Sequence, residues 1–463
     1  MGSTVVGYLR WLGGACCLFL VGFGAVSARW LPWLLIGAIS LAWVALLHPR
    51  LAVLVVGFSA TAFPKAGIKF ASFPFPIAIF SLFLAALILR LKFASGVSIH
   101  ARQAVPLVWI VYSSLVVLKA GMYLDDGIAE IAEFLAWSIL PLALLALSES
   151  SGSIARQFRY SLGLGFSLAV AYGLLQAAAS VEAVAVPGLT YAWGDDLLSK
   201  NNLISDEFSK IPATYQSGNV FGVVSACFLT FALQAIMERR STFFDYWVAS
   251  AALIGVALSG SRTAILAAGM GCAFLIARRG SLLRKVLTTA GAAALALSVL
   301  GARPELGQRY SLEQALQTGG TGRTGGWSSV IRDLTPLQWA IGTSDRAIAV
   351  EGWANLISQI GVIGAMLICL LVSLRVRGRK SGATAMLVCL AAATVVDSSF
   401  ALFPTWFLPA LLVSSADGQS ASPSDGVQPK RRRTARPVGD ASPTGRFARS
   451  DSKSDVAMSS RRS

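Results

Sequence analysis

The sequence predicts an all-α protein, built as a polytopic transmembrane helical bundle. Of its 463 residues, 55% are hydrophobic and only 13% are charged, whereas soluble proteins carry about a quarter charged residues. Apolar runs long enough to cross a bilayer recur from Trp11 to Val413, as in chains with many membrane-spanning helices. Basic residues gather in alternate short segments between these runs. Composition, run length and charge pattern therefore agree.

The apolar runs predict about twelve to fourteen spans. No removable signal peptide is expected, because the first run lacks a small-residue cleavage site and another run follows it at once. The third, ninth, thirteenth and fourteenth runs are the weakest, since they are short. In order, the predicted spans are 11–28, 31–47, 51–64, 73–90, 104–121, 129–147, 161–182, 218–236, 246–259, 263–277, 286–301, 352–374, 383–396 and 400–414.

The charge distribution predicts the orientation, because basic loops of membrane proteins stay in the cytoplasm. With a cytoplasmic N-terminus, the opposite side receives the loops 183–217 and 302–351. The net charge of +16 follows from this bias and from the C-terminal tail, so nucleic acid is not predicted as a partner. The segments that carry the cytoplasmic charge are 48–50, 90–102, 156–159, 238–240, 278–285 and 375–380.

Two parts are expected along the chain, a membrane part at 1–415 and a tail at 416–463. The tail is rich in Ser, Asp, Pro and Arg, which predicts a disordered basic cytoplasmic segment. Its run Lys430-Arg431-Arg432-Arg433 fits either contact with anionic lipid headgroups or plain solvation. Both termini are therefore expected in the cytoplasm.

No metal site or other cofactor is predicted. Both histidines, His48 and His100, fall in segments placed on the cytoplasmic side. The cysteines lie inside apolar runs and none has metal-ligand spacing, so we interpret them as small buried apolar residues. They are Cys16, Cys17, Cys227, Cys272, Cys369 and Cys389.

The motif that organises the functional prediction is Leu258-Ser259-Gly260-Ser261-Arg262-Thr263-Ala264. It places one guanidinium between two apolar runs, where a charge is costly unless it faces water or an anion. A guanidinium beside hydroxyls and free helix-end N–H groups is a typical phosphate site. The alternative interpretation is a short polar turn with an arginine that reaches the membrane surface.

The two long loops supply further candidates on the same predicted face. Aromatic and acidic residues of 183–217 suit sugar binding or an interfacial aromatic belt. This loop leads through Tyr215 and Ser217 to Asn219, where Ser217 and Asn219 either cap the next helix or contact a ligand.

In the loop 302–351, glycines surround Arg323 and expose N–H groups to an anion. A flexible loop with an incidental arginine is the alternative. An amphipathic helix is predicted from Trp327 to Trp339, and Asp345 and Glu351 follow it. A nucleotide-binding P-loop is excluded because no GK[ST] follows the glycines.

These residues resemble the bacterial O-antigen ligase and polysaccharide polymerase (Wzy-type) superfamily of inner-membrane proteins. The resemblance rests on the motif around Arg262, on Ser217-Gly218-Asn219, on Gly322-Arg323 with Trp327, and on the stretch from Ile341 to Gly364. By motif it covers about residues 210–375. It implies a fold similar to GT-C glycosyltransferases, with a large periplasmic loop.

The resemblance implies transfer of a glycan from an undecaprenyl-pyrophosphate-linked donor to an acceptor at the periplasmic face, without nucleotide or metal. Membrane lipids surround such enzymes, and a chain-length regulator would be a protein partner. The resemblance implies Arg262 and Arg323 as ligands of the pyrophosphate. From the residues themselves we add Ser259 and Ser261 as further ligands, and we expect Tyr215, Asn219, Trp327 and Asp345 to place the substrate.

Ligases of the family usually carry a His near the end of the large loop, and this chain has none there. We therefore take Glu351 as the general base, or as the residue that orients the attacking hydroxyl, with Asp345 as the second choice; the alternative for Glu351 is an acid favoured by a helix N-terminus. The missing His also favours polymerisation of exopolysaccharide or O-antigen repeats. A ligase that transfers finished glycan to a lipid or protein, a polysaccharide flippase or transporter, and an inactive glycan-binding subunit are the alternatives.

Overall fold

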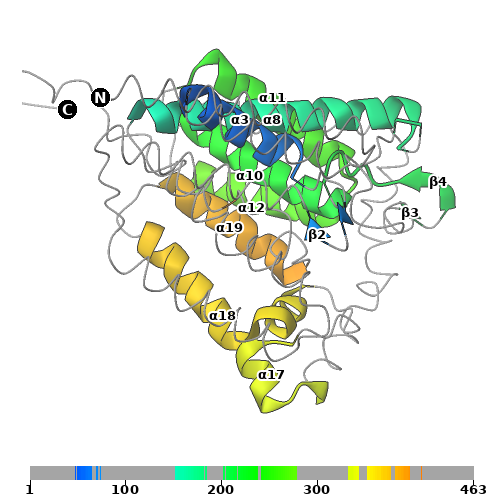
Figure 1. The fold of residues 1–463 in the computed structure, drawn as a ribbon, viewed down its shortest axis with the longest axis vertical. Coiled ribbons are helices and arrows are strands. Elements are labelled where there is room, and N and C mark those ends of the chain that lie inside the picture. Colours follow the sequence, from blue (N-terminus) through cyan, green and yellow to red (C-terminus); the bar gives the residue numbers. More distant parts are fainter. Residues whose placement is uncertain are drawn as a thin grey trace, which may run out of the picture. The chain divides into compact units, whose positions relative to one another are not determined.

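The computed structural model shows a predominantly helical chain (Figure 1). The chain divides into two units, Met1–Ser420 and Ala421–Ser463, and all described residues belong to the first. The structure describes residues 47, 49–64, 69–70, 73–74, 152–181, 183–184, 202–203, 205–215, 217–237, 241–278, 332–343, 352–376, 381–396 and 408.

The described helices confirm the helical class, and four very short strands pair as β1 with β2 and β3 with β4, both antiparallel. The helices are α3 (Pro49–Ala62), α8 (Gly152–Ala179), α10 (Gly218–Met237), α11 (Phe243–Leu258), α12 (Arg262–Arg278), α17 (Pro336–Ile341), α18 (Trp353–Val376) and α19 (Ser381–Val396). The strands are β1 (Lys69–Phe70), β2 (Phe73–Pro74), β3 (Asn202–Leu203) and β4 (Ser205–Ser209).

Two described helical segments are long and apolar enough to cross a membrane, Arg156–Ala179 and Gly218–Met237. Shorter apolar helical segments are Val53–Ala62, Phe243–Leu258 and Thr384–Val396. The predicted spans 11–28, 104–121, 129–147 and 286–301 lie outside the described residues, as do 31–47, 73–90 and 400–414 apart from one or two positions.

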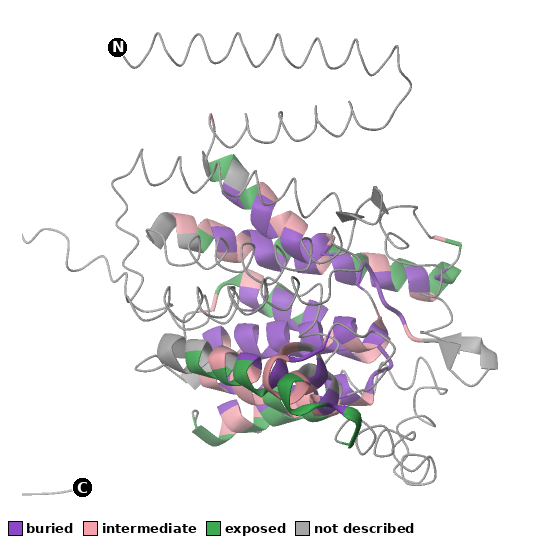
Figure 2. Ribbon diagram, turned by 60° about the horizontal axis from the view of Figure 1, so that its bottom comes forward, coloured by how far each residue is buried: buried purple, intermediate pink, exposed green. Residues whose placement is uncertain are grey.

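Helix α10 lies at the centre of the described helices, in contact with α11, α12 and α19. Nearly every residue from Val220 to Ala235 is buried (Figure 2). Helix α8 joins this core through Phe166, whose ring stacks on Phe228 with 4.2 Å between centroids, and α3 packs on α8. A helix buried on all sides must be largely apolar all round, and α10 contains no charged residue.

Glycines set the spacing and direction of the helices around α10. A Cβ atom at Gly222 would lie 2.5 Å from Ala264 Cβ and 2.5 Å from Ser259 Oγ. Further along, a Cβ at Gly271 would meet Thr230. The contacts advance in the same direction along both helices, so α10 and α12 run parallel. Helix α11 connects them in sequence and runs in the opposite direction to both. A Cβ at Gly255 of α11 would meet Ser225 and Phe221 of α10.

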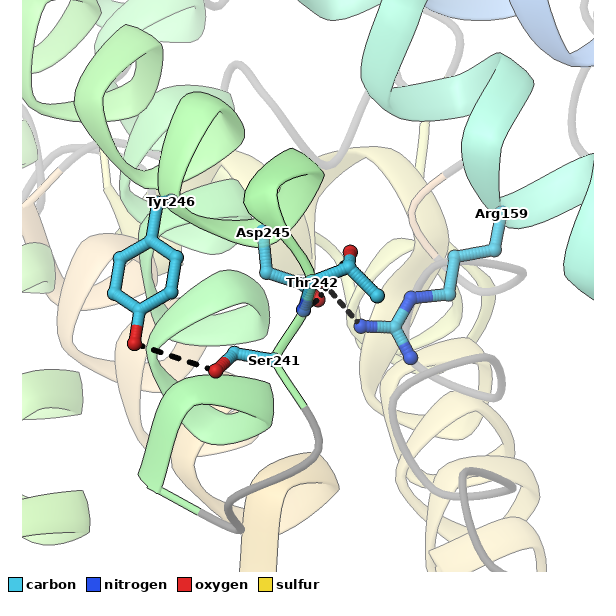
Figure 3. Close-up of polar contacts among 5 residues, drawn as sticks. All are labelled: Arg159, Ser241, Thr242, Asp245 and Tyr246. Atoms are coloured by element: carbon cyan, nitrogen blue, oxygen red, sulfur yellow. Dashed lines mark hydrogen bonds and ion pairs between the residues drawn. The ribbon is translucent and has the colours of Figure 1, made fainter.

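A partly buried ion pair joins α8 to the start of α11 (Figure 3). Arg159 Nη2 donates to Asp245 Oδ1 at 2.9 Å, across 86 residues of sequence, and its guanidinium lies 4.4 Å from the centroid of the Phe231 ring. Asp245 Oδ2 also accepts from the backbone N of Thr242 at 2.8 Å. One carboxylate thus caps α11 and neutralises an arginine. The prediction that 156–159 is a loop is wrong, because α8 begins at Gly152.

The second half of the chain differs from the prediction in two places. The helix expected from Trp327 to Trp339 is interrupted, because Leu334 and Thr335 are not helical. Thr335 instead caps α17, accepting from Gln338 N at 3.4 Å. The predicted span 352–374 is also not one continuous helix, since Gly361 breaks α18 with φ 67° and ψ 172°.

The break in α18 holds α17 in place. A Cβ at Gly361 would lie 2.6 Å from Gly342 N, so the end of α17 packs directly on the break. Helix ends leave carbonyl groups without intrahelical partners, and here Ser358 O accepts from Thr343 N at 2.6 Å. Cysteines in this part of the chain are not all buried as predicted: Cys389 is buried, whereas Cys369 on α18 is exposed.

The tight contact at Gly222 predicts that a larger side chain there lowers the stability of the protein. Gly→Ala within a helix normally stabilises by roughly 0.5–1 kcal/mol, and overpacking a tight contact costs about 1–3 kcal/mol. We expect Gly222→Ala to lower the thermal stability of the purified full-length protein in detergent. Gly269→Ala on α12 is the matched control, because a Cβ there meets nothing within 4 Å, and it should be neutral or stabilising. Equal effects of the two changes would contradict the close packing.

The ion pair makes a second prediction. Asp245→Ala removes both the cap and the partner of Arg159, so we expect a loss of about 2 kcal/mol or more. This loss is below the ~3–5 kcal/mol expected for breaking a fully buried pair, because the Arg159 side chain is 26% exposed. In a double-mutant cycle by chemical unfolding, Arg159→Ala with Asp245→Ala should lose less than the sum of the single losses. Strict additivity would show that the two side chains are not coupled.

Candidate functional site

The turn between α11 and α12 is built by its own serines. Gly260 has φ 59°, a conformation that favours glycine. Ser259 Oγ donates to Val256 O at 2.7 Å and accepts from Ser261 N at 3.2 Å. Ser261 Oγ accepts from Ala264 N at 3.3 Å, which is the bond of a helix N-cap. Both side chains are buried. The predicted phosphate ligands Ser259 and Ser261 therefore shape the turn in this structure.

Arg262 is the first residue of α12 and is half-buried. The turn before it lies against the start of α10, because a Cβ at Gly218 would be 2.7 Å from Ser259 O. Since α10 and α12 are parallel, their N-terminal ends come together at this point. Each helix N-terminus carries a partial positive charge, so the pair forms a place that favours anions.

Lys210 brings a second cation to the start of α10. A Cβ at Gly218 would lie 2.6 Å from Lys210 Cβ, and the Lys210 ammonium donates to Asn219 Oδ1 at 3.2 Å. Ser217 Oγ accepts from Val220 N at 3.3 Å, which makes Ser217 the cap of α10. Of the two interpretations left open by the sequence, capping holds for Ser217, while Asn219 contacts a lysine.

Tyr215 anchors the segment that carries Lys210. Its side chain is 1% exposed, its hydroxyl donates to Thr61 O at 2.9 Å, and its ring stacks on Phe221 at 5.6 Å. Burial raises the pKa of the Tyr215 phenol well above its usual range, so the hydroxyl stays protonated and remains a donor. The structure thus places Tyr215 beneath the candidate site, as a support for it.

The segment Ile211–Tyr215 is fixed at a second point. Gln176 of α8 donates from Nε2 to Ala213 O at 3.2 Å, and Ala213 has φ 51°, a left-handed conformation that is costly for alanine. Gln176 Oε1 and Thr214 Oγ1 are buried and accept no hydrogen bond from the protein. Strain and unsatisfied oxygens are tolerated only where surrounding contacts hold the backbone firmly, so this segment is a rigid platform.

The site as described combines two cations, two helix ends and one amide, from Lys210, Asn219 and the Ser259–Arg262 turn. The other predicted site residues, Arg323, Trp327, Asp345 and Glu351, lie outside the described residues. No group of three or more His, Cys, Asp or Glu side chains that could hold a metal occurs in the described part of the chain. Lys210 was not selected from sequence, because only its contact with Gly218 reveals its place.

Comparison with known proteins adds no assignment: no family model matches this chain, and no curated protein or solved structure matches it.

Two neighbouring residues test the platform. Tyr215→Phe removes the bond to Thr61 O and leaves that carbonyl buried without this donor, at a cost of about 1–3 kcal/mol. Thr214→Val removes a hydroxyl that bonds to no protein group, so it should be neutral or stabilising. Chemical unfolding of the full-length protein measures both. A clear loss for Thr214→Val would mean that its hydroxyl is satisfied by a bound water.

Proposed function

We propose that this protein is a membrane glycosyltransferase that polymerises undecaprenyl-pyrophosphate-linked oligosaccharide repeats at the periplasmic face of the bacterial inner membrane. The observation that carries the proposal is the close approach of the N-terminal ends of α10 and α12, where Arg262 opens α12 and the Lys210 ammonium bonds to Asn219 of α10. Two helix N-termini with a guanidinium and an ammonium at their first turns suit a phosphate-containing group. The resemblance to the polymerase and ligase superfamily supplies the substrate class.

The surface of the described helices supports a bilayer environment. Large apolar side chains stay exposed on α8 and α12, on the faces turned away from α10. At the start of α11, Phe243, Tyr246 and Trp247 are all exposed, and aromatic residues of this kind gather at membrane–water interfaces. Tyr246 accepts from Ser241 Oγ at 3.3 Å (Figure 3). The apolar side chains are Leu164, Leu168, Leu174 and Leu175 on α8, and Ile265, Leu266 and Met270 on α12.

The arrangement also supports a site at one end of the bundle. The aromatic start of α11 and the Ser259–Arg262 turn lie at opposite ends of α11. With the predicted orientation, the turn faces the periplasm, where lipid-linked repeats are joined. The candidate site thus lies at a membrane surface, as an enzyme acting on a lipid headgroup requires.

The proposed reaction is a substitution at the anomeric carbon of the donor. The acceptor hydroxyl oxygen forms the new C–O bond, the bond to the pyrophosphate oxygen breaks, and the pyrophosphate leaves with the electron pair. Arg262 stabilises the charge that develops on this leaving group, because preorganised donors act most strongly where charge appears. Arg323 is the second arginine at the pyrophosphate, an assignment that rests on the resemblance. Glu351 takes the hydroxyl proton, because it is the ionisable group nearest to the place where ligases of the family carry a His.

A flippase or transporter is the second candidate, and one observation favours it. The break of α18 at Gly361 is a discontinuous helix, and transporters build substrate sites from such helices near mid-membrane. The break also has a structural role, because the end of α17 packs directly on it. Polymerisation remains our proposal, because the described cations lie at helix ends and not at the break.

Complementation of a deletion strain tests the proposal. Arg262→Ala should reduce polymer formation by roughly 10²–10³-fold, the loss typical for removing one donor to a developing charge. Single lipid-linked repeats should then accumulate in the periplasmic leaflet. Arg278→Ala, at the other end of the same helix, is the matched control and should leave polymer length unchanged. Immunoblots of membranes check that all variants are inserted.

Three outcomes decide between the candidates. Full-length polymer from the Arg262→Ala variant would refute the catalytic role of Arg262. Accumulation of repeats on the cytoplasmic side would identify a flippase. Polymer that forms normally but stays on its lipid carrier would identify a ligase.

A further inference from the structure

Two cysteines meet where α10, α12 and α19 pack together (Figure 1). Cys227 Sγ of α10 lies 4.0 Å from Cys389 Sγ of α19, and the two residues are 162 positions apart in sequence. Gly271 of α12 makes room for this pair, because a Cβ there would lie 3.1 Å from Cys389 Cβ. The two thiols are therefore direct neighbours across a helix interface.

The surroundings of the pair are apolar and closed. Both cysteines are 0% exposed, and Met386 and Ala393, one helical turn before and after Cys389, are also fully buried. All four residues belong to one hydrophobic core. A thiol is only a weak hydrogen-bond donor, and a charged thiolate would be costly in such a place. A disulfide is neutral and needs no hydrogen-bond donor, so the oxidised pair fits these surroundings as well as the reduced pair does.

The bond requires only a small movement of the two side chains. A disulfide has a sulfur–sulfur distance of about 2.05 Å, so the Sγ atoms of Cys227 and Cys389 must approach by about 2 Å. Rotation of a cysteine about its Cα–Cβ bond from one staggered position to the next moves the sulfur by about 3 Å. A change of rotamer therefore covers the distance while the helices stay in place.

We propose that Cys227 and Cys389 form a disulfide that clamps α19 to α10, with hydrogen peroxide as the oxidant. One thiol attacks the O–O bond of the peroxide and becomes a sulfenic acid, and water is released. The sulfur of the second thiol then displaces the sulfenic hydroxyl, which leaves as water. The two thiols lose two protons and two electrons, which convert one peroxide into two waters. Peroxide suits a closed apolar site because it is small and uncharged. The inference is independent of the proposed function.

Burial makes this clamp slow to close and slow to open. Buried thiols react only when the structure around them opens locally, and the finished bond is shielded from water-soluble reductants in the same way. A cross-link stabilises a protein more when it closes a longer loop, and this one joins residues 162 positions apart. The pair therefore acts as a lasting clamp on the helices and not as a rapid sensor.

Peroxide treatment of the purified full-length protein in detergent tests this inference. The exposed Cys369 is first blocked with a maleimide in the folded protein, which prevents its cross-linking between molecules. After oxidation, the remaining thiols are blocked in denaturant, and mass spectrometry of the digest identifies the cross-linked peptides. We expect a bond between Cys227 and Cys389 in most molecules, and a rise of about 5 °C in the unfolding temperature.

Single substitutions separate the clamp from unspecific oxidation. Cys227→Ala and Cys389→Ala should each lose both the cross-link and the rise in unfolding temperature. Cys272→Ala is the matched control on α12, where the cysteine is only partly buried, and it should keep both. No cross-link in the oxidised unchanged protein would overturn the inference, as would a bond from Cys227 or Cys389 to a different cysteine. A cross-link without a rise in unfolding temperature would overturn the clamp. Should a variant fail to fold, the unchanged protein alone still decides.

Discussion

The close approach of α10 and α12 at Gly222 is the constraint on which the described structure depends. A side chain there would collide with Ala264 and Ser259, so the two helices pack with almost nothing between them. This contact fixes where the Ser259–Arg262 turn lies along the α10 axis, close to the start of that helix. Small residues let helices approach closely enough for packing to stabilise them where water supplies no hydrophobic driving force. The same contact therefore supplies stability and places the site.

Close parallel packing also has an electrostatic cost. Antiparallel neighbours cancel their dipoles, as α10 and α11 do, whereas parallel neighbours add them at both ends. The first turns of α10 and α12 contain no Asp or Glu, so no acidic side chain within these turns offsets this cost.

Local features of the sequence predicted local structure well. The bounds of α10, α11 and α12 follow from apolar runs that end at charges, serines or glycines, and Ser217 was a recognisable cap. The start of α8 was missed because Arg159 is stabilised by Asp245, 86 residues away, and no local pattern shows that partner. The Gly361 break was missed because a glycine inside an apolar run is compatible with a continuous helix. Lys210 was missed as a site residue for the same reason as Arg159, since its neighbours come from distant segments.

The two faces of helix α12 limit amino-acid substitution in different ways. Towards α10 and α19, Ala264, Ala267 and Gly271 have no room for larger side chains, so substitution there is limited by volume. On the opposite face, Ile265, Leu266 and Met270 are exposed, so side chains of different sizes fit there and only their polarity is limited. Among related sequences, one face of this helix should keep its small residues while the other exchanges large apolar residues freely. That pattern of variation would reveal the orientation of α12 without any structure.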